Sequence, residues 1–535
     1  MQGRSQDQRE LLDVESVAGH LIAPGSVFAF LAEHRCRLFP TEMFEDLFPS
    51  GRGRPSVPPD VVATVIVLQT LHGLSDREAA DAVTFDLRWK AACGLPVTAG
   101  SFHPSTLTYW RSRLAQSKRP QRIFEVVRQL IVETGAVKAK TRRALDSTIL
   151  DDAVARQDTV TQLVAAVRRV VRDVPGGAEV VTAHCTGHDY SQPGKPRIAW
   201  DDPAARDELV SALVNDALAV LKQLDLEAIE KDGGKAAEAV ALLALVAGQD
   251  VEPAEDSDGT DGRWRIARNV APDRMISTVD TEARHAHKSR HKRQDGFKAH
   301  IIVEPDTGLI TTARMTKTNG TEGSDSAVGI DLIASDTTID ASMNTGGVPA
   351  SEHRLEVLGD SAYGTGDMLA ALDKAGYVPV IKPWPMRAAI EGGFTLDDFT
   401  YDDDAATLTC PNGVTRRLSA KRIVTFGVAC RGCPLRDRCT TRKDGRSVKV
   451  HQHEALQRAH RQRAKDEEFQ SVYRTHRPMV ERSIAWLTRG NRRVPFRGVV
   501  KNNDWLHHRA AALNLRKLIN LGIDHSETGW TLAQS

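Results

Sequence analysis

The stretch VLGDSAYG, residues 357–364, places an acidic side chain directly after an apolar run. Residues 355–358 are typical of a short buried strand, and the small residues that follow favour a turn as the chain leaves the sheet. A carboxylate at that point, Asp360, is expected to face a cleft rather than the hydrophobic core. The stretch therefore predicts a functional acid at one edge of a sheet.

A second stretch, ALDSTIL at 144–150, has the same character. It reads as a short strand that ends in Asp146 and continues into small hydroxyl residues. Asp151 and Asp152 follow this strand and compete with Asp146 as functional acids. Because they lie past the strand, they are predicted to be surface acids or caps, with a ligand role as the alternative.

The segments between and after these acids predict the order of a sheet. GFKAHIIVEP (296–305) and GLITTARMT (308–316) flank a tight turn, which is a strong hairpin signal. A helix over 366–376 and a strand over 377–383 follow Asp360. This order is that of an RNase H-like α/β fold, in which the first and fourth strands are neighbours. Asp146 and Asp360 are therefore expected to meet.

A third carboxylate is then expected on a helix after the fifth strand. Glu481 fits, because Arg477, Glu481 and Ala485 share one face of a helix. An adjacent apolar stripe is able to pack against the sheet, and it consists of Val480, Ile484 and Leu487. Arg477, one turn from the carboxylate, is placed to hold a phosphate.

Length and composition indicate a multidomain protein without a membrane span. The chain has 535 residues, of which 41% are hydrophobic, so two to four domains are expected. Its longest apolar stretch, at 61–71, is about half of what a bilayer requires. A formal net charge of +1 identifies no partner by itself. We expect a bacterial cytoplasmic protein, associated with the nucleoid when bound to DNA.

The predicted domains are a helical N-terminal domain over 1–120 and an RNase H-like catalytic domain over 136–535. The second is interrupted by a helical insertion at 151–265 and a Cys-rich insertion at 385–465. In the first, a capping box at Ser75 and Glu78 begins the second helix of a helix-turn-helix pattern. That pattern, with a basic aromatic helix at 105–114, favours DNA binding; an ordinary helical bundle is the alternative.

Two basic runs are candidate DNA contacts. Residues 284–298 contain six Lys or Arg and one Asp, and residues 474–501 contain eight Lys or Arg and one acid. Such runs neutralise phosphates, although a basic surface loop is the alternative for the first run. The predicted DNA-binding residues are Lys288, Arg290, Lys298, Tyr473, Arg474, Arg477, Arg489, Arg492 and Arg493.

Four of the seven cysteines are crowded into one segment: Cys410, Cys430, Cys433 and Cys439. Their number and the CxxC pair predict a tetrahedral structural Zn²⁺ site, with free thiols or an iron–sulfur cluster as alternatives. The other three are expected to be small buried hydrophobes: Cys36, Cys93 and Cys185. Trp384 is predicted to be structural, with stacking on an unpaired base as the alternative.

These motifs resemble those of the DDE transposases of bacterial insertion sequences, in the broad group with a Tyr, Arg, Glu, Lys signature. The resemblance rests on LDST with Asp146, GDSAYG with Asp360 and the helix with Arg477 and Glu481. GRPSVPPD and HGLSDREAADAV resemble the N-terminal domain of that family, and the Cys-rich stretch resembles an insertion that many members carry.

The signature is incomplete in this chain. Arg474 stands where the family has its tyrosine, with Tyr473 beside it. Thr488 stands at the lysine position, with Arg489 next.

The resemblance implies a chemistry and partners. Asp146 would bridge two Mg²⁺ or Mn²⁺ ions, while Asp360 and Glu481 would each complete one coordination sphere. The implied activity is binding of terminal inverted repeats, DNA strand cleavage, and attack of the freed 3′-hydroxyl on target DNA, by a homodimer. Two alternatives stay open: an RNase H-like nuclease that cuts without joining, and a transposon-derived DNA-binding protein.

Overall fold

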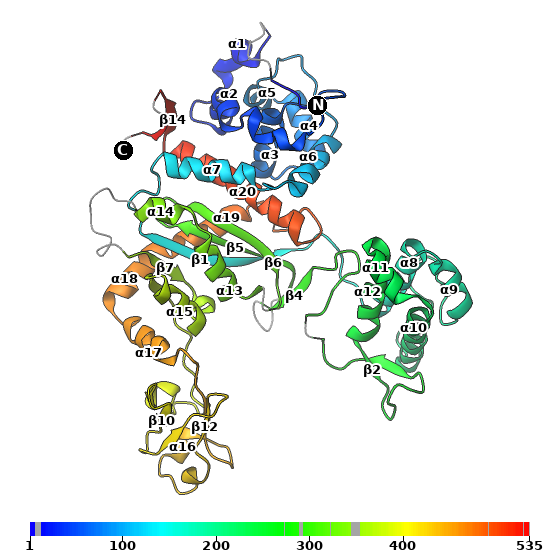
Figure 1. Ribbon diagram of the computed structural model, residues 1–535, viewed down its shortest axis with the longest axis vertical. Helices are drawn as coiled ribbons and strands as arrows, with labels where there is room; N and C mark the ends of the chain where they lie inside the picture. Colours follow the sequence, from blue (N-terminus) through cyan, green and yellow to red (C-terminus); the bar gives the residue numbers. More distant parts are fainter. Residues whose placement is uncertain are drawn as a thin grey trace.

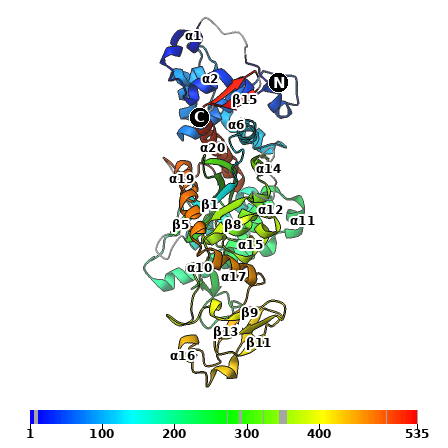
Figure 2. The same ribbon diagram turned by 90° about the vertical axis from the view of Figure 1, so that its left-hand side faces the viewer.

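A six-stranded mixed sheet occupies the centre of the computed structural model (Figure 1). Helices from the first part of the chain lie at one end of the molecule, and the Cys-rich segment lies at the other (Figures 1 and 2). The residues described are 1–5, 12–271, 273–287, 293–320, 323–343, 354–490, 492–527 and 529–533.

The sheet has the strand order β4-β5-β1-β7-β8, with β6 paired to β5. Its strands are β1 (Arg142–Asp151), β4 (Arg284–His287), β5 (Arg293–Glu304), β6 (Leu309–Lys317), β7 (Glu356–Gly359) and β8 (Val378–Ile381). β1 is antiparallel to β5 and parallel to β7, and β7 is parallel to β8. The predicted hairpin is confirmed as β5 and β6, and the two acid-bearing segments are neighbours as predicted.

One detail of the prediction is wrong. β1 is ten residues long, so Asp146 lies within the strand rather than at its end. The strand continues because its second half pairs with β5, from Ser147 opposite His300 to Asp151 opposite Gly296. The parallel pairing with β7 stops earlier, at Ala144.

The two faces of the sheet are covered by different helices. Leu145 and Ile302 belong to a cluster with residues of α13 (Asp325–Ala334) and α15 (Gly366–Lys374). Ala144 and Ile301 belong to the other cluster, with residues of α19 (Pro478–Leu487) and α20 (Val499–Asn520). Since side chains alternate along a strand, Asp146 shares the face of Ala144 and so points towards α19.

The N-terminal helices share a hydrophobic core with this second face. They are α1 (Val14–Ala18), α2 (Val27–Leu38), α3 (Pro59–His72), α4 (Asp76–Phe85), α5 (Leu87–Cys93), α6 (Ser105–Gln116) and α7 (Arg122–Glu133). Every residue of α3 from Pro59 to Thr70 is buried, as expected for a helix that is apolar all round. The C-terminal α20 packs against α3, α7 and β6, so it joins the N-terminal helices to the sheet.

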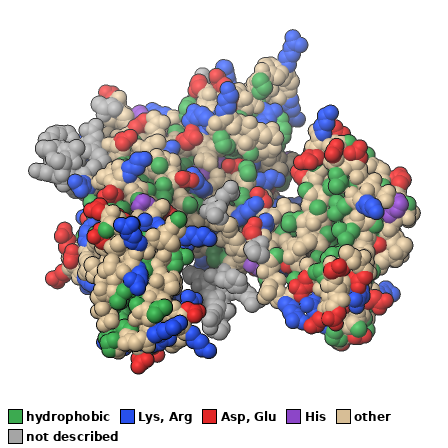
Figure 3. Space-filling view, turned by 60° about the horizontal axis from the view of Figure 1, so that its bottom comes forward, with side chains coloured by type: hydrophobic (Ala, Val, Ile, Leu, Met, Phe, Trp, Pro, Cys, Tyr) green, Lys and Arg blue, Asp and Glu red, His purple; other side chains and the backbone are tan. Residues whose placement is uncertain are grey.

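The segment between β1 and β4 forms a helical unit with its own core. Its elements are α8 (Thr159–Asp173), α9 (Gly177–His184), α10 (Pro203–Gln223), α11 (Leu226–Asp232), α12 (Gly234–Gln249), β2 (Val251–Pro253) and β3 (Trp264–Ile266). Figure 3 shows this unit and the Cys-rich segment as separate lobes on the face turned forward.

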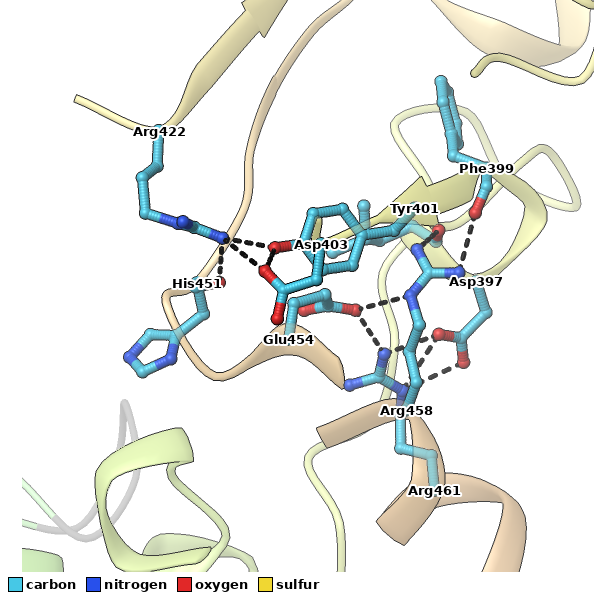
Figure 4. Close-up of polar contacts among 10 residues, drawn as sticks. Asp397, Phe399, Tyr401, Asp403, Arg422, His451, Glu454, Arg458 and Arg461 are labelled. Atoms are coloured by element: carbon cyan, nitrogen blue, oxygen red, sulfur yellow. Dashed lines mark hydrogen bonds and ion pairs between the residues drawn. The ribbon is translucent and has the colours of Figure 1, made fainter. Parts of the chain in front are cut away.

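The Cys-rich segment is built from short strands around a small hydrophobic cluster. Its elements are β9 (Thr400–Asp402), β10 (Thr407–Thr409), β11 (Thr415–Arg417), β12 (Ile423–Thr425), α16 (Arg436–Cys439) and β13 (Ser447–Lys449). Two arginines of α17 (Glu454–Arg463) hold it in place (Figure 4). Arg458 donates to the carbonyl oxygens of Leu396 and Phe399 at 2.7 Å, and Arg461 pairs with Asp397 at 2.6 Å.

The chain then returns to the core through α17 and α18 (Glu467–His476), and after α20 it ends in a hairpin of β14 (Ile523–Ser526) and β15 (Gly529–Leu532). Within the part of the chain that the structure describes, no helix combines the length and the apolar character needed to cross a bilayer.

A buried ion pair fixes the start of β1. Arg143 Nε lies 3.0 Å from Asp336 Oδ2, and both side chains are fully buried. Thr311 donates to Asp336 at 2.6 Å, and Arg143 also donates to Thr338 at 2.9 Å. The pair links β1 to β6 and to the short α14 (Thr338–Met343).

Candidate active site

The register of two parallel strands places Asp146 and Asp360 at the same level. Ala144 of β1 is opposite Leu358 of β7, and each acid comes two residues later. The Asp146 carboxylate accepts a hydrogen bond from the amide of Ser147 at 2.8 Å. The Asp360 carboxylate accepts one from the amide of Ala362 at 2.9 Å and caps a short 3₁₀ turn. The predicted meeting of these two acids is supported by this register.

The third acid comes from the helical segment that packs against the same face. The Arg477 amide donates to the Tyr473 carbonyl at 3.0 Å, and Pro478 begins α19, so the chain keeps turning from α18 into α19. Tyr473, Arg477 and Glu481 therefore occupy successive turns of one side. The predicted shared face of Arg477 and Glu481 is borne out by their ion pair.

Arg477 connects the helix to the sheet. Its Nη2 atom lies 3.1 Å from Asp146 Oδ2, and its Nη1 atom lies 3.5 Å from Glu481 Oε1. The Arg477 side chain is 5% exposed, whereas that of Glu481 is 66% exposed. Buried in this way, Arg477 Nε and Nη1 find no hydrogen-bond acceptor among the described residues. The guanidinium thus has capacity left for an anionic ligand.

The charges around Asp146 are strongly coupled. Burial raises the pKa of Asp146; the nearby Arg477 opposes that shift, and the charge of Asp360 adds to it. Burial also raises the pKa of Tyr473, and the charges of Asp360, Glu481 and Asp146 raise it further. Tyr473 is thus within electrostatic reach of all three acids. Arg474 beside it is exposed, so the tyrosine is the neighbour that faces the site.

Three carboxylates are the hard oxygen donors that Mg²⁺ and Mn²⁺ prefer. The pKa of Asp146 is raised chiefly by burial, and a cation bound beside it would favour the charged carboxylate. Nowhere within the described ranges, however, are three or more His, Cys, Asp or Glu side chains already gathered closely enough to hold a metal ion. Arg477 lies between Asp146 and Glu481 instead.

The alternative acids have structural surroundings. Asp152 is 7% exposed, so the prediction of a surface position is wrong for it. Its carboxylate accepts from the amide of Val154 at 3.0 Å, a local turn of the kind expected for a cap. Asp151 is the last residue of β1, and its backbone forms an isolated parallel β-bridge with that of Arg493.

Several predicted DNA-binding residues make contacts within the protein. Lys298 pairs with Asp325 at 2.6 Å, so its charge is balanced. Arg492 donates to the Thr148 hydroxyl at 2.6 Å, and Arg493 Nε donates to the Asp152 carbonyl at 2.7 Å. Arg474, Arg489, Arg492 and Arg493 are exposed. Lys288 and Arg290 lie outside the described residues.

The four crowded cysteines all line one cavity of about 20 Å³. Burial raises the pKa of Cys439, and Cys430, Cys410 and Cys433 raise it further, so the four thiols are close neighbours. They are free thiols and are not assembled into a metal-binding group in the described structure. The cavity is the size of a single water or ion.

Other predictions for single residues have mixed outcomes. Cys93 is buried as expected, but Cys36 is exposed and Cys185 is half-buried, so the prediction of buried thiols is wrong for Cys36. Trp384 is 54% exposed, which contradicts a structural tryptophan packed in the core. It borders a cavity of about 210 Å³ together with Lys449 and His451.

The sequence reasoning missed a cluster on α20. His508 and Arg509 are 2% and 6% exposed. A signal was present, because HHR at 507–509 lies between the apolar residues 505–506 and 510–513. Such residues are rarely buried without a partner.

Two family descriptions match parts of the chain. Residues 409–519 match "Transposase DDE domain", which covers the four crowded cysteines and the helix with Arg477 and Glu481. Residues 28–113 match "Transposase domain (DUF772)", which covers most of the N-terminal helices. No curated protein and no solved structure matches the chain. Both matches, in the order that the motifs predict, support a DDE transposase of an insertion sequence.

Proposed function

We propose that the protein binds the terminal inverted repeats of its insertion sequence and catalyses divalent-metal-dependent DNA cleavage and strand transfer on an RNase H-like core. The observation that carries the proposal is the alignment of Asp146 and Asp360 on neighbouring parallel strands, with Arg477 joining Asp146 to Glu481. The sheet order, with β1 between the hairpin and β7, supports the same core.

The proposed roles follow from the chemistry of the side chains. Asp146, Asp360 and Glu481 would hold two Mg²⁺ or Mn²⁺ ions, which when bound stabilise the charge on the entering and leaving oxygens of a phosphodiester. Arg477 has unused donors and would orient the scissile phosphate. Tyr473, on the preceding turn, would support Arg477 from the same side. After cleavage, the freed 3′-hydroxyl would attack target DNA in the same site.

We also propose a structural Zn²⁺ bound by Cys410, Cys430, Cys433 and Cys439. The four thiols border one cavity of single-ion size, and their pKa coupling marks them as neighbours. Zn²⁺ would draw the thiolates together and contribute roughly 10 kcal/mol to a unit with only a small hydrophobic cluster. In this proposal the metal has no part in the reaction.

The helical domain over 1–120 would contact the DNA ends, and a homodimer would bring two ends together, as the family resemblance implies. The direct test is Mn²⁺-dependent cutting and joining of a labelled element end by the purified protein. Cutting without joining, on any duplex, would favour a nuclease. Binding without either reaction would favour a DNA-binding protein.

A further inference from the structure

A cleft of about 990 Å³ opens between the N-terminal helices and the segment that connects α19 to α20. One wall is the end of α3 with the turn into α4, and the other is the stretch from Leu487 to Phe496. α20 contributes part of the lining through Trp505, His508 and Arg509. None of the predicted catalytic acids lines the cleft.

The charges that line the cleft are unbalanced. The lining contains five arginines and a single acidic residue, Asp76. That acid is already paired with Arg111 at 2.5 Å, so it neutralises one of the five. Arg77, Arg489 and Arg493 are exposed. A concave surface with an excess of one sign concentrates its field and attracts the opposite charge.

Arg509 adds a buried positive charge to this excess. It is 6% exposed, and no described carboxylate lies within ion-pairing distance. Its N–H groups donate instead to carbonyl oxygens at the ends of two helices: those of Thr70 and Leu71 in α3, and of Trp486, Leu487 and Arg489 in and after α19. Helix C-termini carry only about half a negative charge each, and a buried cation usually has a full countercharge.

His508 adds a polar atom without a partner. Its side chain is 2% exposed, and Nε2 has no hydrogen-bond partner among the described residues. Burial lowers the pKa of His508 to about 3, so the ring is neutral at physiological pH. Buried polar atoms are nearly always hydrogen-bonded, and the exceptions call for an explanation.

A basic track connects the cleft to the proposed active site. Glu481 precedes the cleft residue Leu487 by six positions on α19, which is about 9 Å along the helix axis. Arg482 on α19 and Arg489, two residues after the helix ends, are both exposed. A backbone held at the acids could therefore continue past Arg482 to the cleft.

We propose that this cleft binds the phosphate backbone of the DNA duplex that adjoins the cut site. Arg77, Arg489 and Arg493 contact phosphates directly. Arg509 already donates its N–H groups to backbone carbonyls, so it contributes only its positive charge, from beneath the surface of the cleft. We infer DNA as the ligand because the cleft is continuous with the proposed cutting site. In this respect the inference rests on the proposed function. The bound strand then spans the N-terminal helices and the catalytic sheet.

The test is the salt dependence of DNA binding, measured by fluorescence anisotropy in EDTA so that no cutting occurs. Each neutralised phosphate contributes about −0.9 to the slope of log K against log salt. Arg77→Ala and Arg489→Ala should each make the slope shallower by about 0.9 and weaken binding severalfold at about 100 mM salt. Arg206→Ala removes an exposed arginine of α10 as a matched control and should change neither quantity.

Two duplex series distinguish the source of the phosphates. In one series the duplex extends from the cut site only into the element, and in the other only into the flanking DNA. Arg489→Ala should weaken binding only while the duplex still contains the segment that lies in the cleft. The series in which shortening abolishes the effect of Arg489→Ala therefore contains that segment. Slopes for both cleft variants equal to that of Arg206→Ala would overturn the inference. If the parent binds through the cleft but cuts nothing with Mn²⁺, the proposed function fails alone. If it cuts while the slopes are unchanged, the inference fails alone.

Discussion

Arg477 Nη2 lies 3.1 Å from Asp146 Oδ2, although Arg477 stands at the start of α19 and Asp146 lies in β1, more than three hundred residues earlier. The contact brings a positive charge to the place where the proposed reaction would hold metal ions. Arg477 compensates part of the charge of Asp146 and Glu481. If the proposed ions bind, Asp146 and Glu481 would exchange this partner for metal.

The first prediction concerns the three acids. Asp146→Asn, Asp360→Asn and Glu481→Gln should each reduce Mn²⁺-dependent cutting by roughly 100- to 1,000-fold, because each removes stabilisation of transition-state charge. A labelled element end on a sequencing gel measures the cut. Glu468→Gln changes an exposed acid of α18 and should cut normally. Normal cutting by any of the three acid variants would refute its assignment.

A second prediction concerns pH and stability. Burial raises the pKa of Asp504 on α20 to about 6. The pKa of Asp504 is higher in the folded protein than in the unfolded chain. The free energy of unfolding therefore falls as the pH rises from about 4 to 6, and it stays at the lower value above pH 6. Asp504→Asn should therefore raise the free energy of unfolding by about 2 kcal/mol at pH 8.

That advantage should shrink as the pH is lowered through 6, which urea unfolding at several pH values will show. Asp207→Asn, at an exposed position of α10, is the control and should leave the urea midpoint unchanged at every pH. A constant gap between the Asp504 variant and the parent would contradict the burial effect.

The third prediction concerns metal in the Cys-rich segment. Mass spectrometry of the purified protein should find one zinc per chain, and Cys433→Ser should lose it. Chelation should speed proteolysis within 385–465, because the segment has only a small hydrophobic cluster to stabilise it. Cys36→Ser removes an exposed thiol that is far in sequence from the Cys-rich segment, and this variant should keep the zinc. If the parent protein contains no zinc and a chelator does not change its rate of proteolysis, the site is ruled out.

The fourth prediction concerns the buried pair of Arg143 and Asp336. Arg143→Met should lower the free energy of unfolding by about 3–5 kcal/mol, since it leaves the Asp336 charge buried. Arg143→Met combined with Asp336→Leu should recover part of that loss, because no charge then remains. Urea denaturation compares the variants. A double variant no more stable than the single one would show that the other contacts of Asp336 dominate.

The sheet order and the neighbouring positions of Asp146 and Asp360 were predictable because their signals are local. An apolar run, a turn and an acid recur at Asp146 and Asp360, and the 305–308 turn identifies the hairpin between them. Strand order then followed from the sequence of elements, and helical spacing related Arg477 to Glu481. The full length of β1 was missed because it depends on pairing with β5, which no local pattern reveals.

The remaining errors concern burial, which is set by packing between distant segments. Asp152 is buried where β1 meets the segment after α19, Trp384 is exposed, and Cys36 is exposed on α2. His508 and Arg509 were missed for the same reason. Arg509 joins carbonyls of α3 to carbonyls around the end of α19, and this contact exists only in the assembled fold.

The packing of α20 against α3 has a consequence for synthesis on the ribosome. α3 is buried all round, and part of its cover comes from a helix translated more than four hundred codons later. The nascent N-terminal helices therefore emerge with an open apolar flank and must wait, or be shielded by a chaperone, until α20 arrives. Products of premature termination before α20 would expose that flank permanently and be prone to aggregate.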